Sequence, residues 1–229
     1  MRGLLGHVRR RAGGPGAAPA LERKPESYYA QQRADLVARL PRPLGRVLDV
    51  GCGGGGAAAP LRRAGAAHIT GIELDEAAAE AARARYDRVL RGPVEELLAD
   101  LAGPFDTILC YDVLEHLVDP WGVLRALRGR AAPGGSLHVS VPNARHHSLL
   151  RDLALRGTFG YAEWGHRDIT HLRWFTRRDL AAALSGAGWT LVGIGHDPLV
   201  PASRLVARLT RGLSADFLVY QWQALARAV

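Results

Sequence analysis

Lysine is almost missing from this chain of 229 residues: Lys24 is the only one, and arginine supplies nearly all of the formal net charge of +8. The arginines stand beside abundant alanine and glycine, a bias typical of a GC-rich genome. No segment combines lysines with the aromatic side chains that line a nucleic-acid groove. We therefore expect no nucleic-acid partner, despite the positive charge.

Cysteines and long apolar runs are scarce as well. Cys52 and Cys110 lack the spacing of a metal site, and both are predicted to be buried, reduced residues at the ends of neighbouring strands. No apolar stretch reaches the ~18 residues that a membrane helix requires. Residues 1 to 20 lack the apolar core of a secretory signal. These absences predict a cytoplasmic protein without stable membrane insertion.

The remaining composition fits one α/β domain, since 48% of the residues are hydrophobic. Residues 1 to 24 are expected to be a mobile basic segment, and residues 25 to 229 a single domain. Helices are predicted at 26 to 40, 56 to 64, 76 to 85, 94 to 101, 120 to 129, 177 to 187 and 201 to 212. Strands are predicted at 46 to 50, 68 to 73, 87 to 91, 106 to 111, 136 to 141, 189 to 196 and 217 to 226. Their alternation predicts a parallel sheet with helices on both faces.

The most informative segment is the glycine-rich stretch that follows the first strand. Gly51, Gly53 and Gly55 permit positive φ angles and let the backbone come close to a ligand. About 20 residues later a second strand ends in Glu73, where a carboxylate can accept hydrogen bonds from both hydroxyls of a ribose. The loop and the distant acid together predict a nucleotide-like cofactor.

Two cofactor classes use this arrangement, because the glycines also match the dinucleotide pattern GxGxxG. Asp49 separates the two classes. Its charge would repel the pyrophosphate of NAD and attract a cationic ammonium or sulfonium group. The sequence therefore favours S-adenosylmethionine.

Three further segments carry a family resemblance: residues 112 to 116 (DVLEH), 141 to 143 (VPN) and 168 to 176 (DITHLRWFT). With the glycine loop they resemble the class I S-adenosylmethionine-dependent methyltransferases, especially a bacterial subgroup from polysaccharide and natural-product gene clusters. The resemblance implies a Rossmann-like, mostly parallel seven-stranded sheet whose final strand is antiparallel. It also implies S-adenosylhomocysteine as product. Pro93 departs from the family, which usually carries an acid there near the adenine amino group.

The resemblance assigns the cofactor site to the strand ends and the first helix. Asp49 and the glycine loop would hold the methionine part, Glu73 the ribose, and Val94 and Glu95 the adenine. The full set is Tyr28, Asp49, Gly51, Cys52, Gly53, Gly55, Glu73, Leu74, Val94, Glu95, Tyr111, Asp112 and His116.

The alternation of elements stops over residues 142 to 175, and we interpret this segment as a substrate cover because long connections usually carry function. It contains four of the nine histidines, and histidine is suited to take the proton of a hydroxyl acceptor. The first candidate base is His171 and the second is His146, with Asp168 as an orienting or basic carboxylate. Candidates for acceptor binding are Asn143, His147, Tyr161, Trp164 and Arg173.

The predicted reaction is methyl transfer to a hydroxyl of a small molecule, with a sugar or glycosylated metabolite preferred. N-methylation of an amino sugar or amine is one alternative, and a non-catalytic, cofactor-binding regulatory protein is another. A monomer or homodimer is expected.

Two further alternatives concern metal and membrane. No metal is assigned, because Glu115 and His116 of the DVLEH segment are more typical of a helix cap and of packing. The other oxygen and nitrogen ligands weighed with them are Asp112, His146 and Asp168. The basic helix at 201 to 212 is expected to cover its own sheet rather than to touch a membrane.

Overall fold

The computed structural model describes residues 33–197, 199–211 and 214–229. Of the helix predicted over 26 to 40, the described part is α2 (Ala34–Val37), which packs Leu36 and Val37 into the core. Tyr28 and the basic segment at 1 to 24 lie outside the described residues.

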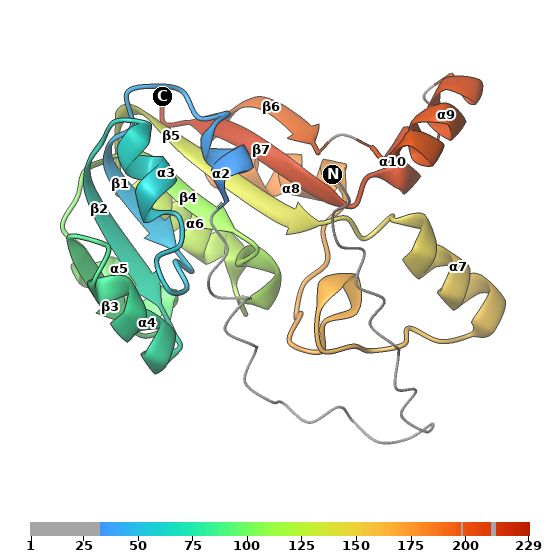
Figure 1. Cartoon of the computed structure of the whole chain (residues 1–229), viewed down its shortest axis with the longest axis horizontal. Coiled ribbons are helices and arrows are strands. Elements are labelled where there is room, and N and C mark those ends of the chain that lie inside the picture. The colour runs from blue at the N-terminus through green and yellow to red at the C-terminus, as the bar shows by residue number, and fades with distance from the viewer. Residues whose placement is uncertain (1–32, 198, 212–213) are drawn as a thin grey trace, which may run out of the picture.

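Seven strands form one sheet: β1 (Gly45–Val50), β2 (Ala66–Glu73), β3 (Arg88–Arg91), β4 (Phe105–Tyr111), β5 (Ala131–Pro142), β6 (Thr190–His196) and β7 (Gln221–Arg227). Their order is β3-β2-β1-β4-β5-β7-β6 (Figure 1). β7 is antiparallel to both of its neighbours, β5 and β6. The pairs from β3 to β5 are all parallel. The predicted Rossmann-like sheet with an antiparallel final strand is therefore confirmed.

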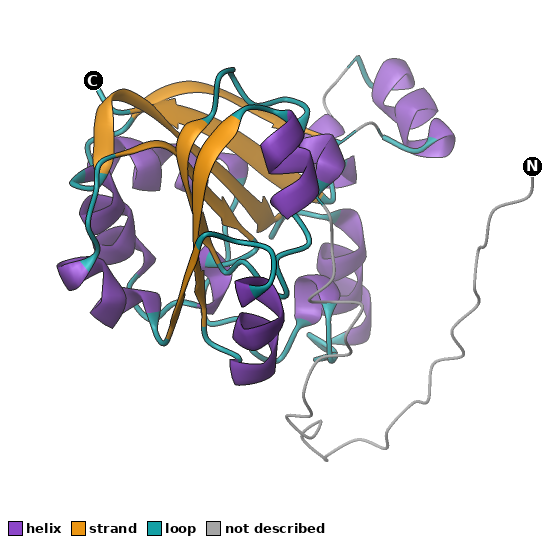
Figure 2. Cartoon of the chain, turned by 60° about the vertical axis from the view of Figure 1, so that its left-hand side comes forward, coloured by secondary structure: helices purple, strands orange, loops and turns teal. Residues whose placement is uncertain are grey.

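Helices cover both faces of this sheet, as predicted (Figure 2). They are α3 (Ala58–Arg63), α4 (Glu76–Arg83), α5 (Val94–Asp100), α6 (Pro120–Arg128) and α8 (Arg177–Gly186). α2, α3 and α4 share one core cluster with Val47 and Leu109. α5, α6 and α8 share the other with Leu48 and Ile108. Since side chains alternate along a strand, Asp49 points to the face covered by α2, α3 and α4.

The cover segment contains a helix that the sequence analysis did not predict, α7 (His147–Arg156). Leu149 is the buried leucine of this helix, and its other leucines are exposed. The helix therefore has no buried apolar stripe with helical spacing that the sequence could have shown. Its buried Asp152 instead accepts hydrogen bonds from Arg151 and Arg167, which lower the pKa of this carboxyl to about 2. Arg167 lies after α7 in the chain, so this ion pair joins α7 to the later part of the cover.

The largest differences from the predicted strand boundaries are at the beginnings of β5 and β7. β7 begins at Gln221 because a short helix, α10 (Ala215–Leu218), occupies the beginning of the strand predicted at 217 to 226. β5 begins earlier than predicted, at Ala131, and a register shift against β4 lets the strand continue through Pro133 and the glycines after it.

The helix predicted near 201 to 212 is present as α9 (Pro201–Leu209), but the expectation that it covers the sheet is wrong. Leu205, Val206 and Leu209 are exposed, so its apolar face points away from the core. None of the helices in the described part of the chain has the length and apolarity needed to cross a bilayer.

Gly71 in β2 supports the first prediction, because an added Cβ would lie 2.6 Å from Sγ of Cys52 and 2.9 Å from Cδ2 of Tyr86. Gly71→Ala should lower the free energy of unfolding by about 1 to 3 kcal/mol, as overpacking does. Urea denaturation measures this change. Gly193→Ala in β6 is the matched control, since no atom lies within 4 Å of its added Cβ. Equal effects of the two substitutions would contradict the assigned lack of space at Gly71.

Candidate active site

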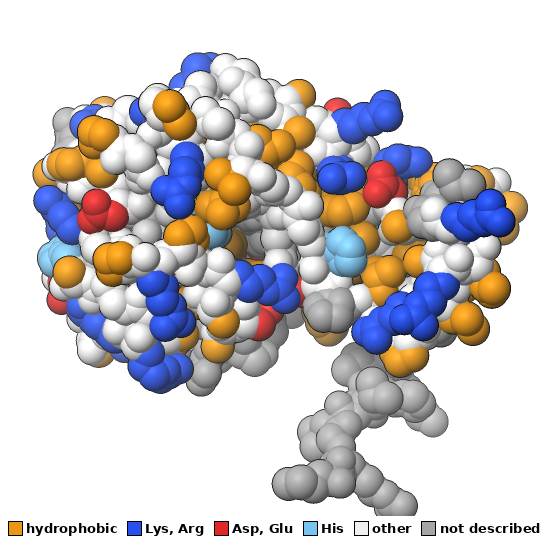
Figure 3. Space-filling view, turned by 90° about the horizontal axis from the view of Figure 1, so that it is seen from above, with side chains coloured by type: hydrophobic (Ala, Val, Ile, Leu, Met, Phe, Trp, Pro, Cys, Tyr) orange, Lys and Arg blue, Asp and Glu red, His pale blue; other side chains and the backbone are white. Residues whose placement is uncertain are grey.

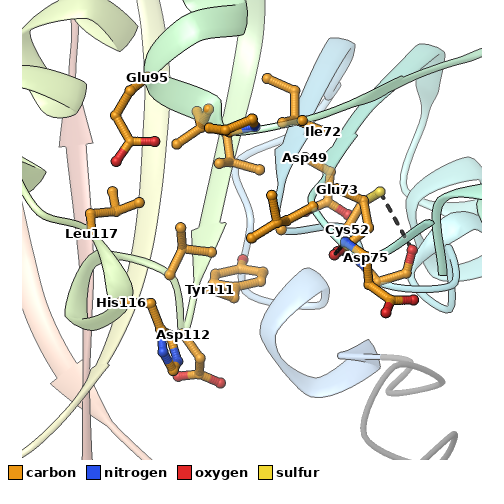
Figure 4. Close-up of a pocket in the computed structure, with 18 of the residues that line it drawn as sticks. Asp49, Cys52, Ile72, Glu73, Asp75, Glu95, Tyr111, Asp112, His116 and Leu117 are labelled. Atoms are coloured by element: carbon orange, nitrogen blue, oxygen red, sulfur yellow. Dashed lines mark hydrogen bonds between the residues drawn. The ribbon is translucent and has the colours of Figure 1, made fainter. Parts of the chain in front are cut away.

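A cavity of about 850 Å³ opens at the carboxyl ends of β1, β2 and β4. The strand order reverses here, since β2 and β3 follow β1 on one side while β4 and β5 lie on the other. Figure 4 shows Asp49, Cys52 and Glu73 gathered at one end of the cavity. Asp112 and His116 lie at the opposite end.

The lining includes most of the cofactor residues predicted from the sequence. They are Asp49, Gly51, Cys52, Gly53, Glu73, Leu74, Val94, Glu95, Tyr111, Asp112 and His116. Gly55 lies behind this lining, in the turn that leads to α3. Tyr28 lies outside the described residues, so its assignment stays a prediction.

The glycine loop has the backbone shape that its sequence predicts. Gly51, Gly53 and Gly55 have φ angles of 70°, 53° and 75°, in the region that favours glycine. The amide of Gly51 donates to the carbonyl oxygen of Ile72 at 2.8 Å, which ties the loop to β2. At position 51 an added Cβ would also meet Cγ2 of Val113 at 2.5 Å. Turn geometry and close packing therefore both require glycine at this end of the cavity.

Asp49 is a buried carboxylate on the cavity wall, with 5% of its surface exposed. The hydroxyl of Tyr86 donates to its Oδ2 at 2.5 Å. Burial raises the pKa of Asp49 to about 6, and the Tyr86 hydrogen bond offsets only part of this effect. At neutral pH the carboxylate is ionised but poorly solvated, so a cation beside it would be stabilised.

Glu73 ends β2 and is held by the backbone around it. Its Oε2 accepts a hydrogen bond from the amide of Gly53, and its Oε1 accepts one from the amide of Asp75, both at 2.8 Å. Each oxygen keeps a second lone pair for a ligand hydroxyl. The carboxylate is therefore fixed in place at the cavity wall and can still accept from a ribose.

Pro93, Val94 and Glu95 line another part of the cavity, where α5 begins. Val94 is buried and offers apolar surface, whereas Glu95 is exposed and points a carboxylate toward the cavity (Figure 4). Pro93 occupies the N-cap position of α5 without a side-chain cap. Since the first amides of a helix lack intrahelical partners, Val94 and Glu95 can supply backbone donors here.

Asp112 follows β4 and joins three separate parts of the chain. Its φ angle is 55°, a left-handed conformation that Asp tolerates better than most residues. The carboxylate pairs with Arg33 at 2.6 Å, accepts from the hydroxyl of Ser140 at 3.0 Å, and accepts from the amide of Gln221. Arg33 itself lines the cavity, so this ion pair brings the beginning of the described chain to the site.

His116 connects the cavity lining to the cover. Its Nδ1 lies 3.0 Å from Oγ1 of Thr170 and 3.2 Å from the carbonyl oxygen of Thr170. A carbonyl oxygen only accepts, so Nδ1 carries a hydrogen in this contact. Thr170, which also lines the cavity, donates from its amide and its hydroxyl to Oδ1 of buried Asp168, at 3.0 and 2.7 Å.

His171, the first candidate base, packs its ring edge-on against that of His116, with 4.7 Å between ring centroids. His171 and Asp168 therefore lie next to residues that line the cavity, although neither lines it directly.

Glu115 is the least solvated acid near this site. It is 1% exposed, and neither carboxylate oxygen has a hydrogen-bond partner in the described structure. Burial raises its pKa well above the ordinary value and so favours the uncharged carboxyl, whereas a cation beside it would favour the charged form. Ligand atoms of Glu115, His116 and His171 lie within 4.8 Å of one another and could hold a metal ion. Of the ligands weighed from the sequence, this group shares Glu115 and His116 but adds His171.

His146, the second candidate base, belongs to a different cluster. Its ring stacks on His166 with centroids 4.8 Å apart and touches His147, and its Nδ1 lies 2.8 Å from Oγ of Ser148. Burial, reinforced by these histidine neighbours, lowers the pKa of His146 to about 4. The cluster lies outside the cavity lining, and His146 and His171 pack against different rings, those of His166 and His116.

The residues predicted to bind the acceptor lie outside the lining of the cavity. Asn143 is fully buried and donates to the carbonyl oxygens of Asp216 and Val219, which fixes α10. His147 and Arg173 contact backbone carbonyl oxygens. Tyr161 and Trp164 are exposed on the cover, and none of the five lines the cavity described above.

Several lining residues were missed by the sequence analysis. Asp75, Val113 and Leu117 stand directly beside predicted residues, so a wider window around each motif would have found them. Arg33 and Thr170 carry no such signal, because only tertiary contacts bring them to the cavity.

Comparisons with known proteins agree with this geometry. A family model described as "Methyltransferase domain" matches residues 22–194. The ubiquinone biosynthesis O-methyltransferase of Xanthomonas axonopodis pv. citri (strain 306) is 32% identical over 206 residues, which cover 86% of this chain and 84% of the relative. A protein of the same name from Xylella fastidiosa (strain 9a5c) is 38% identical over 197 residues, which cover 81% of this chain and 78% of the relative.

A solved structure shows the same fold. The SAM-dependent methyltransferase from Archaeoglobus fulgidus aligns with a TM-score of 0.67 at 18% identity, over 88% of this chain and 97% of that one. The strand order, the cavity at its switch point and these matches lead to one conclusion: the chain belongs to the class I S-adenosylmethionine-dependent methyltransferases.

Proposed function

We propose that this methyltransferase moves the methyl group of S-adenosylmethionine to a hydroxyl of a small molecule, preferably a sugar or glycosylated metabolite. An oxygen acceptor is supported by the similarity to two ubiquinone biosynthesis O-methyltransferases. The sugar preference and the gene-cluster subgroup follow from the sequence resemblance alone. We place the enzyme in the cytoplasm, as a monomer or homodimer.

The charge of the cavity is the observation that carries this proposal. Of the described residues that line the cavity, one, Arg33, carries a guanidinium group and five are acids: Asp49, Glu73, Asp75, Glu95 and Asp112. The chain as a whole has a net charge of +8, whereas the lining of the cavity is mainly acidic. This local negative charge favours a cationic ligand. S-adenosylmethionine carries a sulfonium and an ammonium group, whereas a pyrophosphate would add negative charge to an acidic site.

The cofactor placement proposed from the sequence is compatible with the side chains found there. Asp49 and the glycine loop hold the methionine part, Glu73 holds the ribose, and Val94 with Glu95 holds the adenine. The acceptor then lies toward His116 and Thr170, at the end of the cavity closed by the cover. His171 adjoins this end, so we assign it as the base that takes the hydroxyl proton, a role worth roughly 10² to 10⁴ in rate.

Cofactor affinity should depend on pH through Asp49. Its pKa of about 6 means that the carboxylate becomes protonated below that pH and no longer attracts a cation. Calorimetric affinity for S-adenosylmethionine should therefore fall about tenfold between pH 7 and pH 5. Asp49→Asn should bind more weakly at pH 7 and lose this dependence. A flat profile in the unsubstituted protein would contradict the role of Asp49.

S-adenosylhomocysteine distinguishes which positive group faces Asp49, because it keeps the ammonium group and lacks the sulfonium charge. We expect the sulfonium to face Asp49, so the affinity for S-adenosylhomocysteine should stay nearly constant over the same pH range. An equal loss for both compounds would assign the carboxylate to the ammonium group instead.

His171→Ala should lower turnover by about tenfold or more, since it removes the proposed base. Cofactor affinity should stay within about twofold, because His171 does not line the cavity. Production of S-adenosylhomocysteine measures turnover, and calorimetry measures affinity. His196→Ala, an exposed histidine at the end of β6, is the matched control and should keep its turnover. Unchanged turnover in His171→Ala would remove this residue from the mechanism.

The same variant separates the alternatives. An N-methyltransferase would tolerate His171→Ala and lose activity below the pKa of its amine acceptor, because a neutral amine needs no base. A regulatory protein would bind the cofactor tightly and accumulate no S-adenosylhomocysteine with any acceptor.

Metal-assisted transfer is a second candidate, favoured by the unpartnered Glu115 carboxylate within the Glu115, His116 and His171 group. A divalent ion there would neutralise Glu115 and lower the pKa of an acceptor hydroxyl. Catalysis by His171 alone predicts full turnover in excess EDTA, and Glu115→Gln should then remain active because burial already favours the uncharged carboxyl. Loss of turnover in EDTA, restored by Mg²⁺ or Zn²⁺ in the unsubstituted protein but not in Glu115→Gln, would establish the second candidate.

A further inference from the structure

α9 presents an apolar face to solvent. Figure 1 shows this helix standing out from the end of the sheet, joined to the body next to α10. Leu205, Val206 and Leu209 are 58%, 43% and 75% exposed, and Val200 just before the helix is 63% exposed. Figure 3 shows hydrophobic side chains and arginines together on this lobe of the molecule. Exposed apolar side chains gathered on one helix are typical of an interaction surface.

The helix is amphipathic as well as exposed. At about 100° per residue, Leu205, Val206 and Leu209 lie on one side of the helix. Arg204 and Arg208 lie on another side, and Arg211 follows just beyond the end of the helix. All three arginines are exposed, and the sequence from 198 to 215 contains neither Asp nor Glu. The surface therefore combines an apolar stripe with charged side chains that are all positive.

The contacts of α9 with the protein leave this stripe uncovered. After the helix, Oγ1 of Thr210 lies 2.7 Å from Oγ of Ser214, which leads into α10. α10 in turn is fixed to the body by Asn143, whose amide donates to the carbonyl oxygens of Asp216 and Val219. The helix is thus anchored through polar contacts at its carboxyl end, and its leucines play no part in the core.

We propose that α9 docks on the surface of an anionic lipid bilayer. Leu205, Val206 and Leu209 would enter the interface between headgroups and acyl chains, while Arg204, Arg208 and Arg211 bind lipid phosphates. The positive charge of α9 favours a bilayer over a second copy of this chain as the partner of this surface. Two copies meeting at this face would bring six arginines together with no carboxylate from residues 198 to 215, whereas an anionic bilayer supplies the opposite charge.

Cosedimentation of the full chain with vesicles tests this surface. Binding is expected to vesicles of equal parts phosphatidylglycerol and phosphatidylcholine, and to be about tenfold weaker to phosphatidylcholine alone or in 1 M salt. Leu205→Asp with Leu209→Asp, and separately Arg204→Gln with Arg208→Gln, should each weaken binding by about tenfold or more. No cofactor or acceptor is present, so the result does not depend on the proposed reaction.

Matched controls come from the end of the molecule away from α9, where α3 and the C-terminus lie (Figure 1). Val229→Asp changes an exposed apolar residue, and Arg63→Gln changes an exposed arginine of α3; both should bind like the unsubstituted chain. Unchanged thermal unfolding and cofactor affinity would show that the α9 variants are folded. The proposal is overturned if the unsubstituted chain stays in the supernatant or if the controls lose binding equally. It is also overturned if the α9 leucines control dimerisation, measured by light scattering, and leave vesicle binding unchanged.

Discussion

A carboxylate held inside the protein is the constraint on which the rest of the site depends. Asp49 lies near the end of β1, buried on the face covered by α2, α3 and α4, and the hydroxyl of Tyr86 donates a hydrogen bond to it. The rise of its pKa from 3.8 to about 6 corresponds to a cost of about 3 kcal/mol at neutral pH. Because the folded-state pKa is raised, stability from this group is greatest below pH 4 and is lost as the pH rises toward 6. A protein that keeps this carboxylate buried at neutral pH therefore has a site at which a cationic ligand would be stabilised.

The surrounding structure keeps that carboxylate in place. Gly71 leaves room for Tyr86 and for Cys52 of the glycine loop, so the strand beside Asp49 has no side chain where the tyrosine must reach. Glu73 at the end of the same strand accepts the amide of Gly53 and thereby joins the loop to β2. On the far side, Asp112 gathers Arg33, Ser140 and Gln221 from three distant segments. The cavity is therefore built by hydrogen bonds between strand ends, whereas the two hydrophobic cores hold the sheet on either face.

The features that the sequence predicts well depend on residues that are close together in the chain. The alternation of apolar runs and helical segments predicts the parallel sheet, and the glycines at 51, 53 and 55 predict the positive φ angles of the loop. Contacts between distant residues were not predictable in this way. Tyr86 and Arg33 show no motif that relates them to Asp49 and Asp112, and α7 is held by an ion-paired Asp152 rather than by a buried leucine stripe. The sequence analysis ranked His171 before His146, but the ring neighbours of the two, His116 and His166, became known only from the fold.

Cys52 gives the cofactor loop a chemical property of its own. Its thiol is buried against Gly71, and burial together with the nearby charges of Asp49 and Glu73 raises its pKa above the ordinary value. Since the thiolate is the form that reacts with oxidants and alkylating agents, we expect this cysteine to react slowly with both, although it lines the cavity. The acids that create a place for a cation thus also protect the sulfur atom beside it, and the loop should withstand oxidative stress without a change in its shape.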